Sequence, residues 1–118
     1  ITIDQTKYTQ NSEIVFKRRL ANISDEPIQY NPFQVASGMV WFYWRLEGST
    51  KWHSGNPTLV WWAGEAPMLS PHAVAEESLK FPAAAFTPPI GRIEVEVLSV
   101  TPNETEVLSN RVRFEVVK

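Results

Sequence analysis

The fold is decided by the stretch Ile93-Glu94-Val95-Glu96-Val97-Leu98. Its aliphatic residues alternate with glutamates, and this period of two is typical of a half-buried β-strand. A second stretch, Arg111-Val112-Arg113-Phe114-Glu115-Val116, alternates in the same way, with arginines on its polar side. Turn-forming residues, Thr101-Pro102-Asn103-Glu104, lie between the two. We therefore expect an antiparallel pair that ends the domain, with cross-strand charge pairs on its outer face.

The rest of the chain also reads as short strands separated by turns. Nine of the 118 residues are prolines, and most lie between the apolar segments. The expected strands are residues 1–8, 14–20, 28–35, 39–46 and 59–62, whereas residues 72–81 fit either a strand or a single helical turn. No long amphipathic stretch supports a helical protein. This pattern predicts one all-β domain over residues 1–118, an immunoglobulin-like two-sheet antiparallel β-sandwich of seven or eight strands.

Composition excludes several classes of protein. The net charge of −2 argues against nucleic-acid binding, and no apolar stretch approaches the ~20 residues that span a bilayer. The chain has no cysteine and only two histidines, so we expect neither a cofactor nor a metal site. No phosphate loop or nucleophile motif is present, and solvation explains the paired glutamates, Glu94 with Glu96 and Glu76 with Glu77. The sequence therefore predicts a protein that is not an enzyme.

The compartment is weakly indicated. The sequence begins at Ile1 rather than methionine, which suggests a processed chain or a piece of a longer one. The absence of cysteine is compatible with the cytoplasm and with bacterial secreted proteins; we favour a secreted, periplasmic or cell-surface location. Two stretches match the N-glycosylation pattern, Asn22-Ile23-Ser24 and Asn103-Glu104-Thr105.

One run of basic residues, Lys17-Arg18-Arg19, falls on an expected strand, so its side chains must divide between the two faces. Arg18 shares the parity of the apolar residues Ile14 and Phe16. We expect Arg18 either to be buried against a carboxylate or to mark a β-bulge that exchanges the faces.

Four stretches carry a resemblance to bacterial immunoglobulin-like domains: Ile14-Val15-Phe16 followed by Asn22-Ile23-Ser24-Asp25-Glu26-Pro27-Ile28, then Leu69-Ser70-Pro71, Pro89-Ile90-Gly91-Arg92-Ile93-Glu94-Val95, and Ser109 to Val116. In layout and length the chain resembles the intracellular proteinase inhibitor domain of bacilli. The resemblance implies a sandwich without enzymatic activity. The tryptophan-rich middle of the chain has no counterpart in that layout, and no functional residue carries over.

All five tryptophans lie between positions 41 and 62. If Phe42 and Trp44 face the core, then Trp41 and Tyr43 face the other side of the same strand. That second face is either covered by the protein itself or is an aromatic stripe that awaits a partner. Trp44 is expected in the core, and Trp52, in a polar loop-like stretch, is expected to be the most exposed tryptophan.

These aromatic residues, with polar neighbours in the adjoining loops, form the candidate site: Trp41, Tyr43, Trp52, His53, Asn56, Trp61, Trp62 and Glu65. Aromatic rings contribute large contact areas at low entropic cost, so we expect a non-catalytic domain that binds a protein partner or forms a homo-oligomer. One alternative is a carbohydrate-binding module that uses the same rings. The other is a proteinase inhibitor, with Trp52 to Pro57 or Ala63 to Ser70 as its loop.

Overall fold

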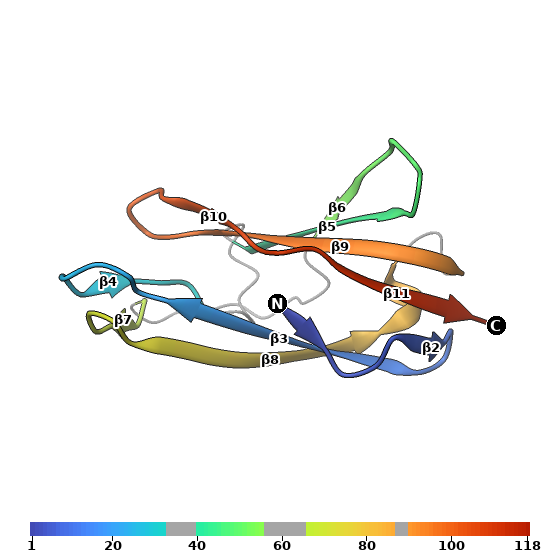
Figure 1. The fold of residues 1–118 in the computed structure, drawn as a ribbon, viewed down its shortest axis with the longest axis horizontal. Helices are drawn as coiled ribbons and strands as arrows, with labels where there is room; N and C mark the ends of the chain where they lie inside the picture. Colours follow the sequence, from blue (N-terminus) through green and yellow to red (C-terminus); the bar gives the residue numbers. More distant parts are fainter. Residues whose placement is uncertain (33–39, 56–65, 87–89) are drawn as a thin grey trace.

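The computed structural model describes residues 1–32, 40–55, 66–86 and 90–118, and these form two packed layers of strands (Figure 1). The smaller sheet has the order β1-β3-β8 and the larger one β2-β11-β9-β5-β6, with β10 beside β9 and a separate β4-β7 pair. The elements are β1 (Thr2–Ile3), β2 (Lys7–Thr9), β3 (Glu13–Ala21), β4 (Ile28–Gln29), β5 (Val40–Leu46), β6 (His53–Gly55), β7 (Met68–Leu69), β8 (Val74–Pro82), the 3₁₀ turn η1 (Ala83–Ala85), β9 (Gly91–Val100), β10 (Glu106–Leu108) and β11 (Val112–Val117).

This architecture confirms the predicted all-β sandwich. In one sheet β3 pairs with β8, and in the other β9 lies between β5 and β11. The predicted count of seven or eight strands is wrong, because the described residues form eleven strands, six of which have only two or three residues. One pair, β2 with β11, is parallel.

The central strand β9 has the predicted alternation and the predicted partner. Ile93, Val95 and Val97 are at most 1% exposed and face the smaller sheet. The strand pairs antiparallel with β11 along one half and with β10 along the other, both on the same edge. β10 and β11 are therefore one strand interrupted at Ser109, whose N–H and Oγ both bond to the backbone of Val97.

An aromatic cluster joins the two sheets at one end of the sandwich. The Phe16 ring meets Phe42 and Phe114 edge to face, with ring centroids 5.6 and 6.2 Å apart. Phe86, which follows the η1 turn, packs against Phe16, Phe114 and Trp44. The Tyr8 ring of β2 extends the cluster, 5.6 Å from Phe114 of β11, and Figure 1 shows β2 and the end of β11 on the right.

The opposite half of the sandwich has a polar interior. Arg18 is 4% exposed, and its guanidinium donates to Glu77, to the Asn31 carbonyl at 2.8 Å and to Ser99 Oγ at 3.2 Å. The prediction that Arg18 is buried against a carboxylate is thus confirmed. The bulge alternative is excluded, since β3 and β8 pair without interruption from Glu13 to Ala21.

That pairing also resolves the ambiguous residues 72–81, of which all but the first two belong to strand β8 rather than to a helical turn. Glu77 faces inward to meet Arg18, whereas Glu76 faces solvent beside Arg19. The two adjacent glutamates diverge, as expected for a strand. The cross-strand partners on β3 select the extended conformation, a long-range effect that a local sequence pattern does not contain.

One buried amide holds the loops at the polar end. The Asn22 Nδ2 group donates to the carbonyls of Glu26, Leu69 and Ser70 at 2.8 to 3.2 Å, and Asn22 Oδ1 accepts from the backbone and hydroxyl of Ser24. Asn22 is 2% exposed, so in the folded domain its nitrogen is inaccessible to a glycan. The second glycosylation pattern is exposed at Asn103.

Gly91 opens β9 with φ +125°, and a Cβ placed there would lie 2.9 Å from Leu46 Cδ2. We expect Gly91→Ala to lower the free energy of unfolding by about 1–3 kcal/mol, since both backbone and contact oppose the added methyl group. Gly48→Ala is the matched control, because Gly48 also has positive φ but an added Cβ meets nothing within 4 Å. Urea titrations of both variants measure the free energy of unfolding. Equal losses in the two variants would show that the contact with Leu46 does not contribute.

Asn22→Asp preserves the shape of the side chain but replaces the donor with an acceptor. Three carbonyls would then face a carboxylate, and we expect a loss of about 2–4 kcal/mol in unfolding free energy. Ser24→Ala removes only the hydroxyl bonds and should cost about 1 kcal/mol. Urea denaturation followed by circular dichroism measures both, and a neutral Asn22→Asp variant would contradict the assigned role.

Candidate functional site

The outer face of the larger sheet carries the predicted aromatic residues of β5. Its first feature is a cross-strand row of Trp41, Leu98 and Leu108, which the β5–β9 and β9–β10 registers place side by side. Trp41 is 37% exposed and Leu108 is 60% exposed. We name these three residues the apolar row. Such a row on a solvent-facing sheet is a typical feature of an interaction surface.

Charged residues fill the two neighbouring rows. Glu94 lies between Arg45 on β5 and Arg113 on β11, in direct register with both. Its carboxylate accepts from Arg45 Nε at 2.8 Å and from Arg113 Nε at 2.9 Å, and Arg111 Nη1 lies 3.5 Å away. We name these four residues the arginine cluster. Arg111 also donates from Nε to Glu96 at 2.7 Å, so the cluster continues into the row next to Tyr43.

Burial of Glu94 was not foreseen. The sequence predicted a solvated residue on the polar face of the strand, but Glu94 is only 4% exposed because the arginine side chains cover it. Hydrogen bonds from Arg113 and Arg45 hold the pKa of this carboxyl below its ordinary value of 4.5, and they outweigh the opposite effect of burial. Glu94 is therefore an ionised anchor that fixes three long side chains in place.

Trp52 lies over two of these arginines. The guanidinium carbon of Arg45 is 4.4 Å from the ring centroid of Trp52, and that of Arg111 is 5.3 Å away. Both distances are typical of cation–π contacts. The expectation that Trp52 is the most exposed tryptophan is wrong among the three described ones, since it is partly buried and Trp41 is more exposed. Trp52 lies in a loop, as predicted for this polar stretch, and only the last three residues of the stretch form a strand, β6 (His53–Gly55).

The predicted site residues do not all meet. Trp41, Tyr43 and Trp52 share the outer face of the larger sheet. His53 lies on the inner face, where its ring stacks on Trp44 at a centroid distance of 5.9 Å. Trp44 packs partly buried against the core, as predicted. The other four candidates, Asn56, Trp61, Trp62 and Glu65, lie outside the described residues, as does the predicted strand over 59–62.

Two members of the apolar row, Leu98 and Leu108, were not predicted from the sequence. Leu98 follows Glu94 and Glu96 on the outward parity of β9, so its position was available from the alternation alone. Leu108 was not available in this way, because its place opposite Leu98 depends on the interruption of the last strand at Ser109. The sequence signal for such a row is an aliphatic residue, here Leu98, at the next outward-facing position after charged residues, here Glu94 and Glu96.

A second titratable pair stabilises the apolar end rather than forming a site. Tyr8 is 2% exposed, and its hydroxyl donates to Asp4 Oδ1 at 2.5 Å. Burial, reinforced by the bond to Asp4, raises the pKa of Tyr8 to about 12, and the same bond lowers the pKa of Asp4. Asp4 also accepts from the N–H of Val15, so the pair fastens the first residues to β3.

The arginine cluster predicts a pH-dependent contribution to stability. Glu94→Gln should lower the free energy of unfolding by about 2–3 kcal/mol at about pH 7, because three cations lose their carboxylate. The folded-state pKa is lowered, so this stabilisation is present above the ordinary pKa of 4.5 and is lost as the pH falls through the folded-state value. Urea titrations at about pH 7 and about pH 3 should show the wild-type advantage shrinking in acid.

Glu115→Gln is the control for this experiment, because Glu115 lies on the same face opposite Arg92 but outside the cluster. Its effect should stay within about 0.5 kcal/mol at either pH. A Glu94→Gln deficit that is the same at both pH values would contradict the ionised-anchor assignment.

No protein-family model matches the chain, and a search of curated proteins finds no matching relative. Among the described residues, no group of three or more potential metal ligands converges. No helix in the described ranges has the length and apolar character needed to cross a membrane.

Proposed function

We propose that this domain is a non-catalytic binding module that recognises a protein partner through the outer face of its larger sheet. The observation that carries the proposal is the apolar row, in which Trp41 and Leu108 remain exposed beside a set of charges that already satisfy one another. Covering the apolar row therefore yields more favourable binding free energy than covering any other part of this face. A partner that buries it removes apolar surface from water without breaking the arginine cluster.

The composition of the row favours a protein over a carbohydrate. A sugar-binding platform depends on exposed ring faces, but one neighbour of Trp41 is the aliphatic Leu98 and Trp52 is engaged by two guanidinium groups. Aliphatic and aromatic side chains bordered by arginine are common at the centres of protein interfaces. Carbohydrate binding stays as the alternative outcome of the test.

The arginine cluster supports the proposal by keeping the face rigid. Long arginine side chains ordinarily lose conformational entropy when a partner immobilises them. Here Glu94 and Trp52 hold Arg45 and Arg111 before any partner arrives. A preorganised border of this kind lowers the entropic cost of binding at the adjacent apolar row.

A site-specific photocrosslinker at Leu108 tests this function in extracts of the source cells. We expect a discrete protein adduct at Leu108 and none at Lys80, an exposed control position on the smaller sheet. Excess unlabelled wild-type protein should compete for the adduct, and excess Trp41→Glu protein should compete at least about tenfold less well, as about 1.4 kcal/mol of lost binding predicts.

Two results would count against this function. Equal competition by wild-type and Trp41→Glu protein would show that the apolar row does not bind the partner. Saturable adsorption to a polysaccharide, lost in Trp41→Ala, would favour the carbohydrate-binding alternative. Circular dichroism of each variant establishes that the fold is retained.

A further inference from the structure

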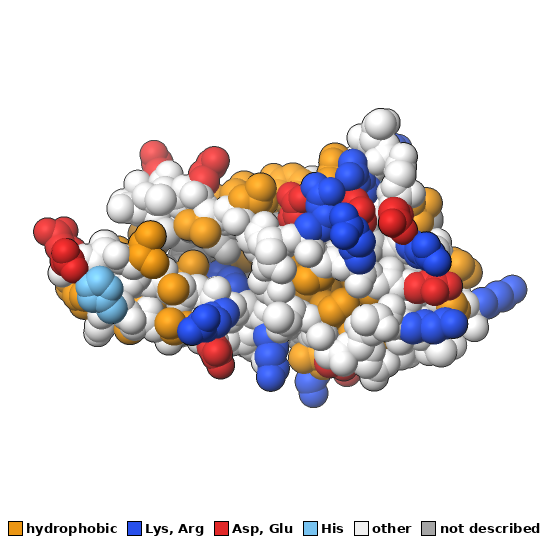
Figure 2. All heavy atoms as spheres, viewed as in Figure 1, with side chains coloured by type: hydrophobic (Ala, Val, Ile, Leu, Met, Phe, Trp, Pro, Cys, Tyr) orange, Lys and Arg blue, Asp and Glu red, His pale blue; other side chains and the backbone are white. Residues whose placement is uncertain are grey.

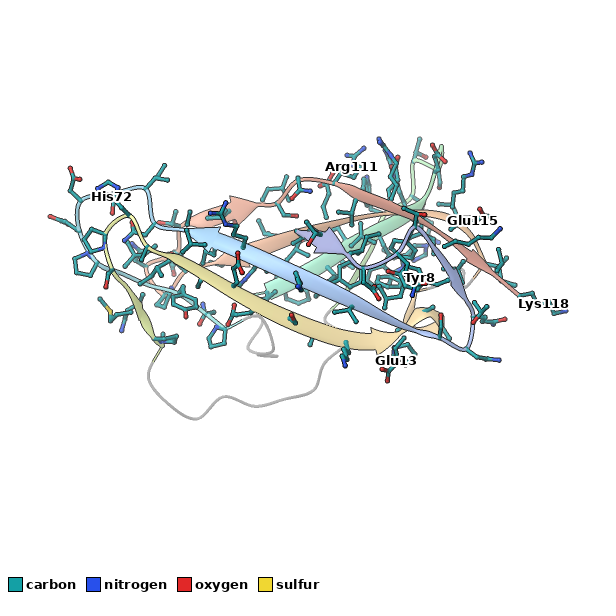
Figure 3. All side chains as sticks on the ribbon, turned by 60° about the horizontal axis from the view of Figure 1, so that its bottom comes forward. Tyr8, Glu13, His72, Arg111, Glu115 and Lys118 are labelled. Atoms are coloured by element: carbon teal, nitrogen blue, oxygen red, sulfur yellow. The ribbon has the colours of Figure 1, made fainter. Side chains whose placement is uncertain are left out.

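The smaller sheet has an edge that is only half covered. β3 pairs with β8 along its whole length, whereas β1 pairs with β3 only at Phe16 and Lys17. Across the described ranges, no strand pairs with Arg19–Ala21 on the β1 side. Figure 3 shows β1 lying along one part of β3 and leaving the part nearer His72 uncovered. This uncovered part is the open edge of β3, residues 19–21.

The backbone at the open edge has donors and acceptors directed outward. In an antiparallel sheet, successive residues direct their N–H and C=O groups to opposite neighbours. The N–H of Val15 bonds to Asp4 on the β1 side, and that of Asn22 bonds to Ala73 on the β8 side. By this parity, Arg19 and Ala21 direct their N–H and C=O groups toward the open edge, while Leu20 directs its own toward β8.

A cavity of about 210 Å³ lies next to this edge, between the two layers. Its walls include Leu20 from β3, Val97 from β9, and Val107 and Leu108 from β10, and the buried Arg18 also lines it. Figure 2 shows hydrophobic side chains gathered between the layer that contains β10 and the layer that contains β3. A side chain opposite Leu20 on an added strand would point into this cavity, because directly opposed residues share a face.

The charges at the edge are mainly basic. Arg19 is 70% exposed, and its Nε lies 3.7 Å from Glu76, a loose solvent-facing pair. Lys17 lies on the same face of β3, and Arg18 lies between the two on the inner face. A carboxylate on an added strand directly opposite Arg19 would form a cross-strand ion pair of the kind that stabilises sheets.

We propose that the open edge of β3 accepts an extended segment of a partner protein as an added antiparallel strand. The segment has an aliphatic residue opposite Leu20 and an acidic residue opposite Arg19. Main-chain hydrogen bonds to Arg19 and Ala21 supply affinity, and the cavity and Arg19 supply specificity, as in other modes of strand addition. This surface belongs to the edge of the smaller sheet and shares only Leu108, which lines the cavity, with the apolar row.

The probe is the peptide acetyl-Thr-Ser-Thr-Val-Glu-amide at millimolar concentration, with Val intended opposite Leu20 and Glu opposite Arg19. Hydrogen exchange of the full chain, followed by NMR, is the readout. We expect the amide protons of Arg19 and Ala21 to exchange more slowly by a factor of one plus the ratio of peptide concentration to Kd, about threefold at twice the Kd. The Leu20 amide, which already faces β8, should keep its rate.

Two N-methylated peptides separate strand addition from simple apolar adhesion. Methylation of the Glu nitrogen removes a bond to Arg19 and should weaken binding by roughly tenfold. Methylation of the Val nitrogen, which points away from β3, should leave Kd within about twofold. Charge exchange tests the partner's chemistry. The Arg19→Glu variant should bind the Glu peptide more weakly and should bind a peptide with Lys in place of Glu. Lys80→Glu, a control on the same sheet, should leave the affinity for both peptides unchanged.

Three outcomes would overturn the proposal. The first is unchanged exchange at Arg19 and Ala21 in millimolar peptide. The second is equal weakening by the two methylations, which would indicate contact through side chains alone. The third is protection of Arg19 and Ala21 that rises with the concentration of the protein by itself, which would assign the edge to a second copy of this chain.

Discussion

The alternation of side chains along β9 is the constraint on which the rest of the molecule depends. This strand is central in the larger sheet, so its odd-numbered residues form the core while its even-numbered residues form the outer face. A slip of one residue would exchange Val95 with Glu94 and would place a carboxylate among the phenylalanines. The free energy of that exchange sets the registers of β5, β10 and β11, and those registers create the apolar row and the arginine cluster.

Period-two reasoning predicted the parts of the structure that depend on one strand and its parity. It placed Trp41 and Trp44 on opposite faces of β5, paired β9 with β11, and identified Arg18 as an inward charge. It did not predict the burial of Glu94, because that burial is produced by side chains from two neighbouring strands. It also did not predict strand β6, since the pairing of His53 with Trp44 is a long-range contact that the local sequence pattern does not contain.

Short strands were the other part of the fold that the sequence pattern could not predict. Strands of two or three residues, such as β6 and β7, have too few alternations to be distinguished from loops. The functional interpretation is affected in the same way. The candidate site residues formed one group along the chain, yet the fold places His53 and Trp52 on opposite faces of the larger sheet. The surface neighbour of Trp41 is the aliphatic residue Leu98.

The polar interior around Arg18 has a consequence for how this domain moves. Its two ends are held by different forces, since aromatic packing joins the sheets near Phe16, while hydrogen bonds from Arg18 to Ser99 and from Asn31 to Val100 connect to β9 toward the Asn22 end. Cooperative units in proteins follow such differences in local contact. Sub-global unfolding should therefore begin at the Asn22 end and leave the phenylalanine cluster assembled. The domain then behaves as two foldons in series, with β3 and β9 running through both.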